Sequence, residues 1–273
     1  MQKIARNDGD LQCGTVDNLP QHAGATLVDQ VHAGLDAGEF RVAFQPIVHA
    51  KSRVLNGVEC LLRWQHPQYG LLLPGAFECA LKDSSVTHRV LRLVLDVACR
   101  ELRMQRDAGH EVLPLVAINV QPSQLLDDRI PAEIDEATRR YGVHPSSLEL
   151  ELVESEETLK LVVTREFTSP LRSMGVRLAL DDFGTGYSSL AALAAANVDS
   201  VKLAREFLSS RAPDRAAKVL ERMFDLLGEL QLRVVVEGVE RGEQLDWLAA
   251  YPAVYAQGYF IGRPGYEFPS VES

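Results

Sequence analysis

Short apolar runs alternate with longer amphipathic segments along most of this chain. The runs match β-strands, and the segments between them carry apolar residues at the spacing of helices that cover a core. The run Pro-Leu-Val-Ala-Ile-Asn-Val at 114–120 is almost wholly apolar, which indicates a strand buried on both faces. The expected strands cover residues 40–48, 54–64, 114–120, 147–153, 176–182, 200–203, 232–236 and 255–258, and the expected helices cover 26–37, 87–108, 132–141, 161–174, 188–196, 214–230 and 243–250.

About eight strand–helix units with no Pro/Gly/Ser linker between them predict one α/β domain, a closed (β/α)8 TIM-like barrel with helices outside. The 273 residues, 46% of them hydrophobic, suffice for one such barrel or for two small domains. Residues 1–24 are polar and mixed in character. We therefore expect a flexible N-terminal segment at 1–24, a barrel domain at 25–268 and a short tail at 269–273.

Charge and cysteine usage narrow the class of protein. The formal net charge of −10 argues against a nucleic-acid duplex as the main ligand, because such proteins present a basic face to phosphates. Cys13, Cys60, Cys79 and Cys99 lack Cys-x-x-Cys spacing and the density of a disulfide scaffold, which favours a reducing, cytoplasmic location. No segment is apolar and long enough for a signal peptide or a bilayer span, so we expect no membrane association.

The stretch from Val176 to Leu190 is the most informative part of the chain. An apolar strand stops on Asp181 and Asp182 and passes through Gly-Thr-Gly before an Ala/Leu-rich helix. Two adjacent acids at a buried strand end disfavour each other's ionisation, so we expect a cation opposite them, and a divalent metal would satisfy both. The alternative is that these acids cap the following helix and face water.

The strand expected at 54–64 ends in Glu-Cys-Leu-Leu-Arg-Trp. Period-two alternation puts Glu59, Leu61 and Arg63 on one face, so that a carboxylate and a guanidinium share it. The pair is either part of a site or an ion pair on a solvated strand.

Polar residues recur near the C-terminal ends of the expected strands. In a barrel these ends meet at one mouth, where such enzymes keep their chemistry, so distant segments would build one pocket. Each residue alone has a simpler explanation: a cap for Asn119, a surface charge for Lys202, a loop acid for Glu237. The residues concerned are Glu59, Asn119, Glu151, Asp181, Asp182, Lys202, Glu237 and Gln257.

The side-chain types of this set indicate the chemistry. Several carboxylates and an amide, with no His or Cys, suit Mg²⁺ or Mn²⁺ better than a thiolate zinc site. With Asp181 as a bridge, two ions roughly 3.5–4 Å apart could activate a water and stabilise both oxygens of a phosphodiester displacement. Lys202 would orient or deprotonate that water or offset charge on the phosphorane, and Arg63 would hold a phosphate.

These residues lie in motifs that resemble the EAL family of cyclic di-GMP phosphodiesterase domains. The resemblance covers residues 40–264 and rests on Gln-Pro-Ile at 45–47, Glu-Cys-Leu-Leu-Arg-Trp at 59–64, Asp-Asp-Phe-Gly-Thr-Gly-Tyr-Ser-Ser-Leu at 181–190, Glu-Gly-Val-Glu at 237–240 and Gln-Gly-Tyr at 257–259. It implies a barrel whose first strand runs antiparallel to the others. It also implies hydrolysis of cyclic di-GMP to linear 5'-pGpG with Mg²⁺ or Mn²⁺.

The resemblance also implies residue roles. Lys202 and Glu237 are the expected catalytic residues, and Lys202 matches the water-positioning lysine of the family. Glu154 matches the acid that anchors the loop after Asp182, a loop that links metal binding to dimerisation, so a homodimer is expected, with a regulatory protein as a further partner. The implied metal ligands are Glu59, Asn119, Glu151, Asp181, Asp182 and Glu237, and the implied nucleotide contacts are Gln45, Leu61, Arg63 and Gln257.

Ala204 is the main departure from the family pattern. An Asp is typical at this position, next to the second metal and the catalytic water, and loss of such an acid commonly costs about 10- to 100-fold in metal affinity or activity. Cys60 replaces the usual Ala or Val, and Val153 replaces the usual Thr before Glu154.

Two functions therefore stay open. The first is a working phosphodiesterase that lowers the second messenger. The second is a degenerate domain that binds cyclic di-GMP or a protein without turnover, and residue 204 discriminates between them. An unrelated barrel enzyme acting on sugar phosphates is disfavoured, because residues 257–260 lack a Gly-rich phosphate cradle.

Overall fold

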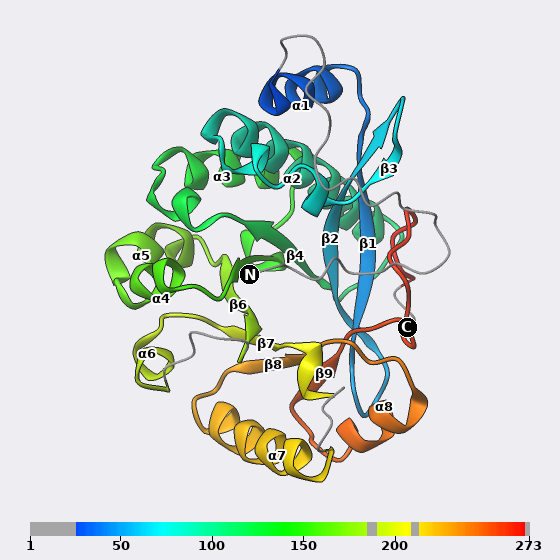
Figure 1. Cartoon of the computed structure of the whole chain (residues 1–273), viewed down its shortest axis with the longest axis vertical. Coiled ribbons are helices and arrows are strands. Elements are labelled where there is room, and N and C mark those ends of the chain that lie inside the picture. Colours follow the sequence, from blue (N-terminus) through cyan, green and yellow to red (C-terminus); the bar gives the residue numbers. More distant parts are fainter. Residues whose placement is uncertain (1–25, 185–189, 209–212, 271–273) are drawn as a thin grey trace.

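Eight strands close into a barrel with helices on its outside (Figure 1). The computed structural model describes residues 26–184, 190–208 and 213–270, so the segment expected at 1–24 and most of the expected tail lie outside the described residues. The strands are β1 (Phe40–His49), β2 (Leu55–His66), β3 (Gly70–Leu72), β4 (Leu115–Val120), β5 (Leu148–Val153), β6 (Arg177–Phe183), β7 (Ser200–Leu203), β8 (Arg233–Val236) and β9 (Val254–Ala256).

The helices follow the strands in the expected alternation. Figure 1 shows them around the strands, with α2 and α3 next to each other and α7 and α8 at the lower end of the view. The α-helices are α1 (Leu27–Asp36), α2 (Ser84–Asp107), α3 (Arg129–Tyr141), α4 (Glu156–Val163), α5 (Arg165–Ser173), α6 (Leu190–Ala195), α7 (Pro213–Glu229) and α8 (Gly242–Leu248). Short 3₁₀ helices include η1 (Pro74–Ala76), η3 (Pro122–Leu126) and η5 (Arg205–Phe207).

The direction of the first strand confirms the predicted barrel type. β1 pairs antiparallel with β2 on one side and with β9 on the other, and these pairings close the ring. The pairs from β2 through β4 to β9 are all parallel. The β1–β2 register sets Gln45 opposite Glu59, so two expected site residues lie side by side.

Burial along β5 shows how the sequence divides the inside of the barrel from its helical shell. Leu148, Leu150 and Leu152 are fully buried on one face of the strand, and Glu149 and Glu151 are buried on the other. Because side chains alternate along a strand, the leucines pack under the helices and the two acids point into the barrel. Two carboxylates inside the barrel therefore need partners there.

Two sequence-based predictions were wrong. The helix expected at 161–174 is two helices, α4 and α5, which meet at Thr164 in an extended conformation. The β-branched residues that end α4 favour this break, and α4 begins earlier because the Ser155 side chain accepts a hydrogen bond from Thr158 N. The second concerns residues 65–86, where no strand was expected: this segment contains β3, which forms a hairpin with β2 in which Gln65 pairs with Leu71.

The end of the barrel opposite the mouth holds a second polar cluster. Arg233, at the start of β8, lies 3.4 Å from Glu149 Oε2 and donates to Asn56 Oδ1 at 2.9 Å from Nη2. The guanidinium also lies 4.4 Å from the centroid of the Tyr255 ring, and Ser200 donates to the other oxygen of Glu149. Both carboxylate oxygens of Glu149 therefore have polar partners at this end of the barrel.

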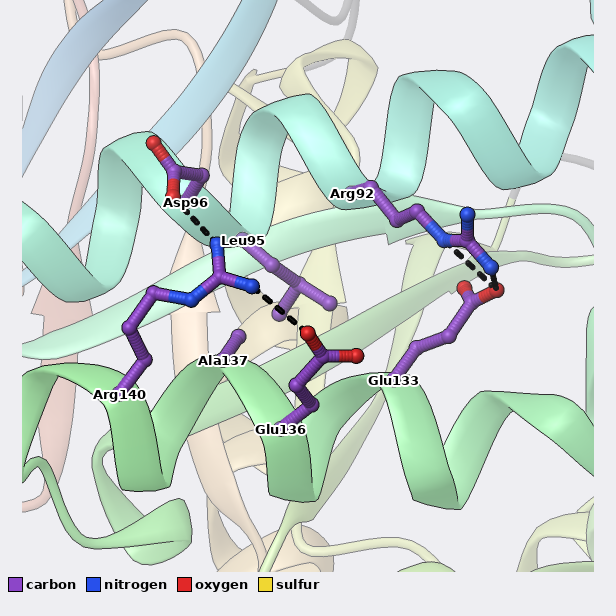
Figure 2. A pocket seen from close by; sticks show the side chains of 7 residues that line it. All are labelled: Arg92, Leu95, Asp96, Glu133, Glu136, Ala137 and Arg140. Carbon is purple, nitrogen blue, oxygen red and sulfur yellow. Dashed lines mark hydrogen bonds and ion pairs between the residues drawn. The ribbon is translucent and has the colours of Figure 1, made fainter.

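A groove of about 250 Å³ lies between α2 and α3 on the helical shell (Figure 2). Its charged side chains pair with one another: Arg92 with Glu133 at 2.9 Å, and Arg140 with Glu136 at 2.6 Å. None of the expected site residues lines it. Among the described residues, the helices are too short or too polar to cross a membrane.

Candidate active site

The ammonium group of Lys202 lies at the centre of the barrel mouth. β7 carries this side chain, which is 1% exposed, into the interior. Nζ lies 2.9 Å from Glu151 Oε2, 2.9 Å from Glu237 Oε1, 3.1 Å from Glu59 Oε2 and 3.4 Å from Asp181 Oδ1. The structure thus brings together five residues that are far apart in the sequence, while their chemical roles remain predictions.

The charge of this cluster is strongly negative. Burial by itself favours the neutral amine, but the surrounding Asp181, Glu151, Glu237 and Glu59 outweigh it and hold the pKa of Lys202 well above its ordinary value. Burial likewise raises the pKa of Glu151 well above its ordinary value; Lys202 opposes this shift, and Glu59 and Asp181 add to it. One ammonium cannot balance four carboxylates, so the site favours a further cation.

Amide side chains line the part of the mouth that is formed by β1, β2, β4 and the end of β9. Gln257 Nε2 donates to Glu59 Oε2 at 2.7 Å and to Gln45 Oε1 at 3.2 Å. Asn119 Nδ2 donates to Glu59 Oε1 at 2.9 Å, and Gln45 Nε2 donates to the Gly262 carbonyl at 3.2 Å. Both oxygens of Glu59 therefore have fixed partners, which orient this carboxylate toward Lys202.

The pair Asp181–Asp182 lies near the end of a buried strand. Both residues belong to β6 and Asp181 is 4% exposed, so the alternative in which Asp181 faces water is wrong. Asp182 has a φ of 56°, a left-handed conformation that costs energy in a non-glycine residue and is often found at functional sites. Asp181, Asp182 and Glu237 each offer an oxygen within 4.8 Å of the others.

Glu154 connects the loops after β5 and β6. Its Oε2 accepts a hydrogen bond from Gly184 N at 3.0 Å, and its own backbone N–H donates to Asp181 O at 2.9 Å. These contacts fit a loop-anchoring role, which stays a prediction because residues 185–189 lie outside the described part of the chain.

Arg63 and Leu61 lie on the β2 wall of the mouth. β2 is not a solvated strand, because Glu59 and Arg63 are 3% and 8% exposed, so the alternative of a surface ion pair is wrong. Arg63 Nη1 donates to the Leu62 carbonyl at 2.9 Å, and Leu61 is half-buried. Their predicted contact with a nucleotide is untested.

Ala204 follows β7 directly, between the strands that carry Asp182 and Glu237. β7 pairs with β6 on one side and with β8 on the other, up to Leu203. The Ala204 side chain is fully buried, and its methyl group offers no oxygen ligand. The sequence did not predict that the segment after β9 returns along β1, where Phe44 and Gly265 exchange backbone hydrogen bonds.

A divalent cation fits this set of side chains. The available donors are carboxylate and amide oxygens, which hard cations such as Mg²⁺ and Mn²⁺ prefer. Glu151 Oε1 is buried, and within the described chain no group donates a hydrogen bond to it. A buried acceptor without a donor is costly unless it meets a cation, and the Asp181, Asp182 and Glu237 oxygens lie close enough together to share one.

Comparison with known proteins identifies the family. A family model described as "EAL domain" matches residues 28–264. The chain belongs to the EAL domain family. This EAL domain is similar, with 33% identity over 239 residues, to MucR of Pseudomonas aeruginosa, a bifunctional diguanylate cyclase/cyclic di-GMP phosphodiesterase. The match covers 87% of this chain and 35% of MucR.

Two further comparisons agree. The EAL domain is 34% identical over 239 residues to NbdA of Pseudomonas aeruginosa, a cyclic di-GMP phosphodiesterase, with 87% of this chain and 30% of NbdA covered. The chain thus spans about a third of the length of these two relatives. The solved MucR phosphodiesterase in complex with c-di-GMP matches this EAL domain with a TM-score of 0.77 and 33% identity, covering 88% of this chain and 97% of that one.

Proposed function

We propose that this EAL domain is a metal-dependent phosphodiesterase that hydrolyses cyclic di-GMP to linear 5'-pGpG. The observation that carries the proposal is the Lys202 ammonium among Glu59, Glu151, Asp181 and Glu237, contributed by five different strands or strand ends. The similarity to proteins named as cyclic di-GMP phosphodiesterases supports this choice of substrate.

The proposed roles follow from the atoms that each side chain offers. Bound Mg²⁺ or Mn²⁺, in a two-ion site, would lower the pKa of a water and offset charge on the phosphate oxygens. The residues that would hold the ions are Glu59, Asn119, Glu151, Asp181, Asp182 and Glu237.

The protein itself supplies orientation and charge. Lys202, kept cationic by its acidic neighbours, donates hydrogen bonds that position the attacking water and favours negative charge on the phosphate. Arg63 binds a phosphate by its guanidinium, and Gln45, Leu61 and Gln257 contact the nucleotide. Glu237 contacts Lys202 and offers an oxygen within 4.8 Å of Asp181 and Asp182, which suits it to a role in catalysis as well as in metal binding.

Ala204 favours a second candidate function, a domain that binds cyclic di-GMP without turning it over. Ala204 lies fully buried directly after β7, the strand between β6 and β8, and its methyl group offers no ligand. A weakened second ion would slow hydrolysis while leaving Arg63, Gln45 and Gln257 able to bind the nucleotide.

One experiment separates these functions. Purified protein is incubated with cyclic di-GMP and Mn²⁺, product is separated by chromatography, and nucleotide binding is measured by calorimetry. Glu136 is an exposed acid on α3 and serves as the control. Formation of linear 5'-pGpG by the wild-type protein and by Glu136→Ala, but not by Glu59→Ala, supports the phosphodiesterase. Tight binding without product supports the receptor, and neither binding nor product contradicts both.

We also propose that the domain forms a homodimer, engages a regulatory protein and works in the cytoplasm. The support for the dimer is the family resemblance of the loop after Asp182. Light scattering on the purified protein tests it, and a monomer at micromolar concentration contradicts it.

A further inference from the structure

Glycine residues let successive loops at the barrel mouth pack against one another without a gap. A Cβ atom on Gly184, after β6, would lie 2.6 Å from ring atoms of Phe207 in η5, after β7. A Cβ on Gly238, after β8, would lie 2.2 Å from Cβ of Arg205, at the start of η5. Real Cβ atoms do not approach other heavy atoms so closely, so η5 packs against both glycines and leaves no room for a side chain at either position.

Two further glycines at the barrel mouth make the same kind of close contact. A Cβ on Gly258, after β9, would lie 2.2 Å from the backbone oxygen of Val239, after β8. A Cβ on Gly262 would lie 2.6 Å from Cγ of Pro46 in β1. The loops of β6, β7, β8 and β9 and strand β1 are therefore linked in sequence around the mouth.

We call this set of contacts the glycine collar. It consists of Gly184, Gly238, Gly258 and Gly262 together with their partners Phe207, Arg205, Val239 and Pro46.

Each link of the glycine collar lies next to a residue of the proposed site. Glu237 precedes Gly238, Gln257 precedes Gly258, and Gln45 precedes Pro46 in the sequence. Asp182 precedes Gly184 by two residues. A shift of any link therefore moves a site side chain by a comparable distance, because the two are adjacent or two residues apart in the chain.

We propose that the glycine collar sets the spacing of the metal-binding and nucleotide-binding side chains, with Phe207 and Gly258 as positioning residues. The inference rests on the proposed function. Asp181, Asp182 and Glu237 come from strands on either side of η5, and Ala204 adds no ligand between them. The ring of Phe207 against Gly184 and Cβ of Arg205 against Gly238 then fix how far apart these acids lie.

Gly258→Ala tests the link between β8 and β9. The φ of Gly258 is outside the left-handed range, so alanine suits its backbone, and the added methyl must push Val239 away. We expect Mn²⁺ and cyclic di-GMP affinities to fall about 10-fold by calorimetry, at a temperature where circular dichroism shows a folded protein. Gly75→Ala is the matched control, because its Cβ would meet nothing within 4 Å and its φ is also ordinary.

Phe207→Leu tests the link between β6 and β7 without adding an atom to a tight space. We expect Mn²⁺ affinity to fall severalfold, because the side chain that packs against Gly184 becomes smaller. Phe224→Leu is its control: Phe224 packs against Trp247 and Tyr251 in the helical shell, so this change lowers the unfolding temperature and leaves Mn²⁺ affinity unchanged.

The outcomes are distinct. Wild-type Mn²⁺ affinity retained by both Gly258→Ala and Phe207→Leu overturns the positioning role and leaves the proposed function standing. A wild-type protein that binds no Mn²⁺ overturns both. Lower Mn²⁺ affinity in Gly258→Ala and Phe207→Leu, together with wild-type Mn²⁺ affinity in Gly75→Ala and Phe224→Leu, supports the inference.

Discussion

At the scale of single residues, the site depends on where carboxylates are present and where one is missing. Lys202, on β7, has four acidic neighbours, whereas Ala204, directly after the same strand, contributes no charge. The difference between a slow and a fast phosphodiesterase, or between a receptor and an enzyme, is expected to lie at residue 204.

Ala204→Asp adds an oxygen ligand between the strand ends of Asp182 and Glu237. We expect Mn²⁺ affinity to rise about 10-fold and hydrolysis of cyclic di-GMP to accelerate, because another carboxylate completes the donor set. Calorimetric Mn²⁺ titration and a turnover assay measure the two effects. Ala132→Asp, at an exposed position of α3, is the control and should change neither. Unaltered Mn²⁺ affinity in Ala204→Asp would show that residue 204 lies outside the metal site.

Cysteine reactivity is also decided residue by residue. Burial, reinforced by Glu59 and Glu151, raises the pKa of the Cys60 thiol well above its usual value, and burial raises the pKa of Cys99 to about 12. The thiolate is the reactive form, so iodoacetamide at pH 8 should modify exposed Cys79 and spare both buried thiols until the protein unfolds. Mass spectrometry of alkylated peptides measures this. Rapid labelling of Cys60 in folded protein would contradict the buried placement of β2.

At the scale of the elements, β5 serves both ends of the barrel. Glu151 faces the mouth and meets Lys202, while Glu149, two residues earlier, meets Arg233 and Ser200 at the opposite end. Alternation along the strand explains why both acids point inward. One strand therefore carries a carboxylate of the proposed site and a structural carboxylate, and their partners distinguish them.

Glu149→Ala should separate these two roles. It leaves the buried guanidinium of Arg233 without its carboxylate, which commonly costs about 3 kcal/mol of unfolding free energy. Mn²⁺ affinity should stay at the wild-type value, since Glu149 lies away from the mouth. Urea unfolding and Mn²⁺ titration measure the two effects. Glu149→Gln, which can still accept from Ser200, should be less destabilised, and equal losses in both variants would contradict a role for the charge.

At the scale of the whole molecule, barrel closure and site formation are coupled. The site draws side chains from nearly every strand of the ring, so each pairing between strands also fixes a distance at the mouth. Lys202 at the centre of the ring then acts as an internal counter-ion that offsets part of the repulsion between strands.

Lys202→Met should therefore destabilise the metal-free protein as a whole. With EDTA present, we expect its unfolding free energy to fall by about 3 kcal/mol, because the surrounding carboxylates lose the ammonium group that they share. Added Mn²⁺ should restore much of the loss by binding the folded state, as followed by urea unfolding. Lys160→Met, an exposed lysine paired with Glu156, is the control with an effect below about 1 kcal/mol. Equal stability of both variants in EDTA would contradict the counter-ion role.

The sequence by itself determined the barrel and the types of residue at its mouth. Apolar runs separated by amphipathic segments specify strands and helices. Alternation along a strand is a local property of the backbone, and it predicts which face each carboxylate near a strand end occupies. Local pattern did not reveal the β3 hairpin, because Gly70–Leu72 is too short for a periodic signal and pairs with β2 across a turn. It did not reveal the break between α4 and α5 either, because helical periodicity continues across Thr164.

Only the tertiary structure decided which groups touch. The four carboxylates around Lys202, the pairing of Glu149 with Arg233 and the contact of Phe207 with Gly184 all join residues that are far apart along the chain. No spacing rule encodes such contacts, because they depend on how the ring closes and on how far each loop reaches across it. Sequence pattern therefore specified the elements and the residue types at their ends, and packing specified the distances between them.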